Sequence, residues 1–105
     1  MARKRQTLKA TIYDKRGKVL SVGENSYHKS HPKQAEFAKI AGREGAIYLH
    51  AEIAAIIKLK EKANDAYKIF IERYNNNGQP VLAKPCEICE IALDMAGIEI
   101  VEYTK

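Results

Sequence analysis

Only two cysteines, Cys86 and Cys89, occur in this chain of 105 residues, and both lie in the segment PCEIC. Small disulfide-stabilised domains carry more cysteines than this, so the fold must depend on a hydrophobic core. Apolar residues make up 46% of the chain and charged residues 30%, which is a usual balance for a globular protein. The length suits one domain, and we predict a single domain over residues 1–105.

Strand patterns and helix patterns alternate along the sequence. Strands are expected over residues 8–14 and 18–25, joined as a hairpin by the turn DKRG, and again in YKIFIERY and IEIVEY. Helices are expected in HPKQAEFAKIAG, from about residue 50 to 63, and from about residue 86 to 97. The order β-β-α-α-β-α-β predicts an α/β fold, with helices packed on a mixed sheet that contains parallel pairs.

The last expected helix has a clear amphipathic pattern. Its apolar residues Ile88, Ile91, Ala92 and Met95 follow the spacing i, i+3, i+4, i+7, and Gly97 follows at its end. We expect this stripe to face the core.

The cysteine pair is compatible with three kinds of site. A redox pair would use the two cysteines alone, and a closed structural zinc site would add His28 or His31 to His50. An open zinc site would use the cysteines and His50 and leave a fourth position for water, which zinc makes more acidic.

The open site agrees best with the placement of these residues. His50 begins one expected helix and the cysteines begin another, so two helices packed side by side would bring their N-termini together. The helix dipole at an N-terminus favours thiolates. Glu52 would then be available for proton transfer, a role that neither a redox pair nor a structural zinc site requires.

The combination of H-x-E at residues 50–52 with P-C-x-x-C at residues 85–89 is a specific signature. With it, residues 8–103 resemble the cytidine deaminase-like superfamily, which includes cytidine deaminases, deoxycytidylate deaminases and tRNA- or DNA-editing enzymes. The resemblance implies a three-layer-like cytidine deaminase fold. Here we expect a minimal core of it, because the family's usual first helix, fifth strand and last helix have no counterpart in the sequence.

The resemblance also implies the roles of the motif residues. Zinc would be held by His50, Cys86 and Cys89, and Glu52 would be the catalytic proton shuttle of a hydrolytic deamination. The backbone N–H of Ala51 would lie near the carbonyl of the base.

Substrate-binding residues are expected on both sides of the zinc helix. Asn25, in the segment VGEN, matches a family position that binds a sugar hydroxyl, although it could equally end the strand as a cap. The other expected contacts come from Tyr27, His28, Lys29, His31 and Lys84.

The net charge of +5 favours anionic partners, and basic residues are concentrated in the segment 28–43. This segment could hold a 5′-phosphate, follow a nucleic-acid backbone, or form a solvated face. We predict a deaminase that converts a cytosine nucleotide, with dCMP to dUMP and ammonia as the first choice. The alternatives are a free cytidine or deoxycytidine deaminase, a tRNA or single-stranded DNA deaminase, and a zinc-stabilised binding module without catalysis.

The sequence also predicts where the protein acts. Its longest mostly apolar run, IYLHAEIAAII, has 11 residues and is too short to span a membrane, and the segment MARKRQTLKA lacks the apolar part of a secretory signal. We predict a cytoplasmic protein, and small phage-encoded nucleotide deaminases are the nearest resemblance, which would place it in a host cytoplasm.

Two features predict a homo-oligomer. One is an uncovered sheet edge, and the other is the resemblance, since oligomers of the family often complete their pockets between subunits.

Overall fold

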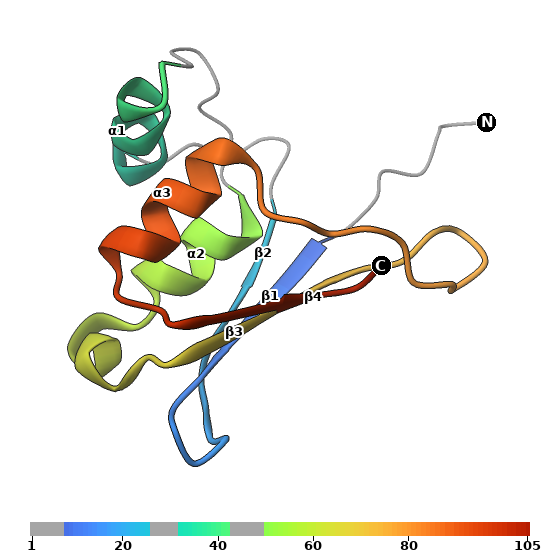
Figure 1. Ribbon diagram of the computed structural model, residues 1–105, viewed down its shortest axis with the longest axis horizontal. Helices are drawn as coiled ribbons and strands as arrows, with labels where there is room; N and C mark the ends of the chain where they lie inside the picture. Colours follow the sequence, from blue (N-terminus) through green and yellow to red (C-terminus); the bar gives the residue numbers. More distant parts are fainter. Residues whose placement is uncertain (1–7, 26–31, 43–49) are drawn as a thin grey trace.

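A computed structural model describes residues 8–25, 32–42 and 50–105 (Figure 1). The strands and helices follow the expected order, with one short 3-10 helix added. They are β1 (Leu8–Tyr13), β2 (Val19–Glu24), α1 (Pro32–Ile40), α2 (Ala51–Ile57), the 3-10 helix η1 (Lys60–Asp65), β3 (Lys68–Arg73), α3 (Glu87–Met95) and β4 (Ile100–Tyr103). None of the described helices is long and apolar enough to cross a membrane.

The four strands form one mixed sheet in the order β2-β1-β3-β4. Strand β1 is antiparallel to both β2 and β3, whereas β4 is parallel to β3. Helix α3 joins the parallel pair, as a crossover connection between parallel strands requires. The mixed α/β architecture expected from the sequence is therefore confirmed.

The hairpin between β1 and β2 is fixed by its turn residues. One carboxylate oxygen of Asp14 accepts hydrogen bonds from the backbone N–H groups of Arg16, at 2.8 Å, and Lys18, at 2.9 Å. Gly17 has a φ of +85°, a conformation that residues with a Cβ rarely adopt. The segment DKRG therefore makes the turn that the sequence predicted.

Helix α2 is buried between the sheet and the other two helices. Ala51 and Ala55 face the apolar side of the sheet, while Ile53 packs with residues of α1 and α3. The helix lies very close to β2, since a Cβ built on Gly23 would be 2.4 Å from the carbonyl oxygen of Ala51. This close approach explains why alanines and a glycine occur where larger apolar residues would usually be found.

The expected helix over residues 50–63 is too long. Helix α2 ends at Ile57, and Lys60 has a positive φ of 51° at the start of η1. Between Ile57 and Tyr67, Leu59 is the one large apolar residue, and it is only 2% exposed. The chain turns to bury Leu59, because the sequence offers no further apolar stripe to hold a longer helix against the core.

The expected apolar stripe of α3 is also wrong at one position. Met95 is 63% exposed, whereas the buried face of the helix consists of Ile88, Cys89, Ala92 and Leu93. Leu93 packs against the sheet, and Ile88 packs towards α1 and α2. Because the helix contacts two layers at once, its buried face is broader than a single stripe and is rotated away from Met95.

Candidate metal centre

The first turns of α2 and α3 carry the candidate metal ligands. His50 is the N-cap of α2 and Cys86 is the N-cap of α3, and both have extended backbone angles. Each backbone carbonyl accepts the first hydrogen bond of its helix, from Ala54 at 2.9 Å and from Glu90 at 2.8 Å. Neither side chain caps its own helix, so both are available to a shared site.

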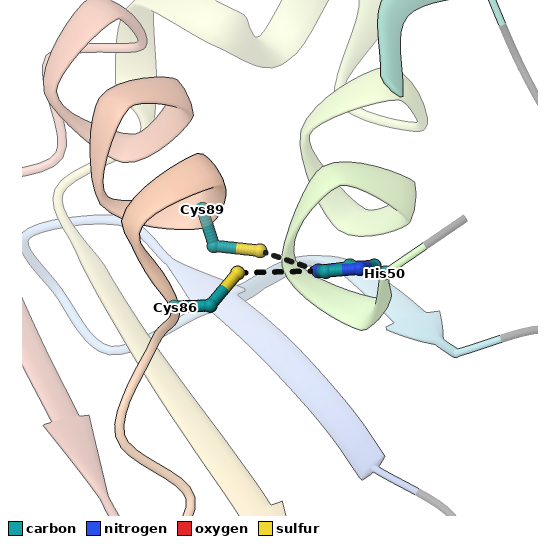
Figure 2. Close-up of side chains that lie close together, drawn as sticks. All are labelled: His50, Cys86 and Cys89. Carbon is teal, nitrogen blue, oxygen red and sulfur yellow. Dashed lines mark hydrogen bonds between the residues drawn. The ribbon is translucent and has the colours of Figure 1, made fainter. Parts of the chain in front are cut away.

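The three side chains converge at one point (Figure 2). His50 Nδ1 lies 3.2 Å from the sulfur of Cys89 and 3.4 Å from the sulfur of Cys86. All three ligand atoms lie within 4.8 Å of one another. A tetrahedral zinc ion bound by nitrogen and sulfur would hold these atoms about 3.5 Å apart, so the donor set and its spacing fit zinc.

The segment that leads into Cys86 is held against the sheet. Val81 donates its backbone N–H to Arg73 at 3.0 Å, and Ala83 donates to Thr104 at 2.9 Å. Pro85 is buried directly before the first cysteine. These contacts fix the position at which α3 begins, and therefore the position of Cys86.

The two cysteines of the site differ in the direction in which their pKa values are shifted. A hydrogen bond from the Cys89 thiol lowers the pKa of Cys86 to about 3, against the effect of burial, and a hydrogen bond from His50 acts in the same direction. The pKa of Cys89 is raised, chiefly because its thiol donates that hydrogen bond and also because it is buried. The surroundings of Cys86 therefore favour its thiolate form, which is the form of cysteine that binds a metal ion.

Glu52 lies in the first turn of α2, two residues after His50, and only 3% of it is exposed. Burial raises the pKa of its carboxyl group, while hydrogen bonds with its own backbone and with Cys89 oppose the shift. Its Oε1 atom has no hydrogen-bond partner among the described residues. A buried carboxylate oxygen without a partner is costly, which indicates that a polar ligand belongs beside it.

One buried residue of the site has no counterpart among the sequence predictions. Gln34 of α1 is completely buried, and its Oε1 accepts a hydrogen bond from the backbone N–H of His50 at 3.2 Å. A glutamine between a lysine and an alanine in a short helix usually faces solvent. The one weak signal in the sequence is Phe37, an apolar residue three positions later and so on the same face of the helix.

The structure places three of the expected substrate-binding residues. Asn25 Oδ1 accepts a hydrogen bond from the backbone N–H of Leu8 at 2.8 Å, so its side chain does support the strand end. Ala51 is buried as the first residue of α2. Lys84 is exposed and lines a hollow of about 330 Å³ beside α3 and β4, together with Tyr103. Contact of these three residues with a substrate stays a prediction.

The other expected substrate contacts, Tyr27, His28, Lys29 and His31, lie outside the described residues. The same holds for Arg43 at the end of the basic segment. Lys33 and Lys39 of that segment are described, and both are exposed on α1.

Comparison with known proteins supports the fold. No protein-family model and no curated protein sequence matches the chain. Eleven chains of known structure do match. Guanine deaminase from Bacillus subtilis superposes with a TM-score of 0.54 and 20% identity, over 91% of this chain and 48% of its own. A mutant cytidine deaminase from Mycobacterium tuberculosis superposes with a TM-score of 0.54 and 18% identity, over 94% of this chain and 68% of its own.

The chain therefore spans about half the length of that guanine deaminase. At these identities the likeness concerns the backbone arrangement alone. The sheet order, the helices and both superpositions agree: this chain has the cytidine deaminase-like fold.

Proposed function

We propose that the chain is a zinc-dependent hydrolytic deaminase. The observation that carries this proposal is the buried Glu52 carboxylate beside a His-Cys-Cys donor set. Within the described part of the chain, its Oε1 has no hydrogen-bond partner. A site that only stabilised the fold would need four protein ligands and no buried acid. The two structural neighbours are named as deaminases, which supports the same reaction class.

The reaction replaces an amine on a ring carbon by an oxygen from water. Water adds to the carbon of a C–NH₂ group that is conjugated with a ring nitrogen, and the C–N bond then breaks to release ammonia and leave a carbonyl. Bound zinc would supply a Lewis acid that lowers the pKa of water. His50, Cys86 and Cys89 would hold that zinc ion, as two thiolates and one neutral imidazole.

Glu52 would carry out the proton transfers of this reaction. Its carboxylate takes one proton from the attacking water and passes it to the ring nitrogen. It then moves the second proton of that water, from the hydroxyl now on the ring carbon, to the departing amine, so that a carbonyl and ammonia are left. One group must therefore act as base and then as acid, which suits a carboxyl whose pKa is raised by burial.

The substrate that we propose is a cytosine nucleotide, dCMP. Support comes from α1, because Gln34 contacts His50 and so holds this helix beside the metal centre. The exposed Lys33 and Lys39 on the same helix would bring positive charge near a bound phosphate. A phosphate held by one or two charge-assisted hydrogen bonds would favour the nucleotide over its nucleoside by about 10–150-fold.

Ammonia release from a small set of substrates tests this proposal. We expect kcat/KM for dCMP to exceed that for deoxycytidine and for a short single strand of DNA, measured at two salt concentrations. Guanine and guanosine belong in the set, because one structural neighbour is named as a guanine deaminase. Equal rates for dCMP and deoxycytidine would reject the phosphate site, and a preferred, salt-sensitive strand would indicate a polynucleotide enzyme. Absence of turnover with every substrate would contradict the deaminase itself.

A further inference from the structure

The buried face of helix α1 contains one polar residue. Gln34, Phe37 and Ala38 form this face, and Phe37 and Ala38 pack in an apolar cluster with Ile88 and Cys89 of α3. Gln34 is 0% exposed, so its amide has lost its hydrogen bonds to water. Burying an amide in this way is unfavourable unless protein groups replace those bonds.

One hydrogen bond of Gln34 is made to the N-terminus of α2, at its N-cap residue His50. His50 is the N-cap of the helix, and the backbone N–H of an N-cap residue has no partner within the helix. In many helices a Glu or Gln at the third helical position accepts a hydrogen bond from this N–H. That position is Ile53 here, whose side chain has no acceptor and packs in the core.

Gln34 of α1 therefore supplies the acceptor that α2 itself lacks. Its Oε1 lies 3.2 Å from the backbone nitrogen of His50. The imidazole of His50 is not used as a cap and extends towards Cys86 and Cys89 instead (Figure 2).

We propose that Gln34 is a positioning residue of the metal centre, which holds the backbone of His50 so that Nδ1 meets the two cysteine sulfurs. This inference rests on the proposed zinc site and adds to it a residue from a third element. Helix α1 also packs against α3, so Gln34 links His50 to a helix that contacts the one carrying the cysteines.

Zinc affinity measured by competition with a chelator tests the inference. The variant is Gln34→Met, which keeps the length and helix propensity of the side chain but removes the amide oxygen. We expect it to bind zinc about 10–100-fold more weakly than the wild type, as is typical when a group that orients a ligand is lost. With cobalt in place of zinc, its absorption spectrum should also change.

The matched control is Phe37→Leu on the same buried face of α1. It loosens the packing against α3 and keeps the hydrogen bond from His50 to Gln34, so we expect a lower melting temperature and a smaller loss of zinc affinity than in Gln34→Met. Should Gln34→Met not fold, Gln34→Asn makes the same test, because it keeps the amide but withdraws the oxygen by one methylene.

Unchanged zinc affinity in the Gln34 variant would overturn the inference and leave the zinc site standing. Equal weakening by Phe37→Leu would also overturn it, because packing alone would then account for the effect. A wild-type protein that bound no zinc would instead contradict the proposed function.

Discussion

At the scale of single residues, Glu52 carries the most specific expectation. Replacing it by glutamine keeps its size and removes its ability to exchange protons, so we predict that Glu52→Gln folds and binds zinc. We expect its turnover to fall by about 10²–10⁴-fold, the usual loss for a general acid-base. The control is Glu61→Gln in η1, which is exposed. Measuring kcat, zinc content and melting temperature together checks the role, and loss of zinc from Glu52→Gln would contradict it.

The metal ligands give a second expectation at this scale. We predict about one zinc ion per chain in the wild type and almost none in Cys86→Ala, because two ligands cannot retain the metal that three hold. Met95→Ala on the same helix is the control, since Met95 is 63% exposed and far along the helix from the site. The zinc content of the wild type, Cys86→Ala and Met95→Ala, measured after dialysis, checks this prediction. Full zinc content in Cys86→Ala would show that the metal binds elsewhere.

The residues of the site differ in how well the sequence could predict them. His50, Glu52, Cys86 and Cys89 belong to two short motifs whose residue types have few other uses together. The structure brings the ligand atoms of His50, Cys86 and Cys89 within 4.8 Å of one another, and their roles stay a prediction. Gln34 belongs to no motif, and its burial depends on how α1 packs, which is a tertiary property. For Asn25 the sequence allowed both a contact with a sugar hydroxyl and a cap at the strand end. The hydrogen bond that its side chain accepts from Leu8 shows the second of these roles.

At the scale of elements, the contact between β2 and α2 sets the position of His50. We predict that Gly23→Ala destabilises the protein by about 1–3 kcal/mol, as added bulk in a packed interior does. The new Cβ would lie 2.4 Å from both Ala51 O and Ala55 N, which are backbone atoms that cannot turn aside. Because Ala51 follows His50, zinc affinity should fall as well.

Chemical unfolding and zinc competition check this prediction. Val19→Ala is the control, because Val19 is on the same strand and 49% exposed, so its free energy of unfolding should change little. A Gly23→Ala protein as stable as the wild type would mean that α2 can move away from β2 without cost.

Strands and turns were more predictable than helix limits for a physical reason. The hairpin follows from Asp14 and Gly17, whose local chemistry dictates the turn. The end of α2 depends instead on Leu59 reaching the core, and the exposure of Met95 depends on α3 contacting two layers. Such contacts come from segments distant in the sequence, so periodicity alone could not reveal them.

At the scale of the whole molecule, β4 is an edge of the sheet that the described strands form. Among its four residues only Glu102 is charged, and Ile100 and Val101 are 37% and 38% exposed. Charged residues usually protect an exposed edge strand, and their scarcity favours pairing with another chain. Val101 also lines the hollow of about 330 Å³ beside α3, whose wall includes Leu93 and Ile98.

We propose that two or more copies of the chain associate through β4, and we predict a molar mass in solution above the 11.8 kDa of one chain. Val101→Lys places a charge at the centre of this edge and should give a monomer. Val19→Lys is the matched control on the opposite edge strand, where a residue of similar exposure should tolerate the same change. Light scattering after gel filtration measures all three proteins. A monomeric wild type would refute the association, and dissociation by Val19→Lys alone would assign it to β2 instead.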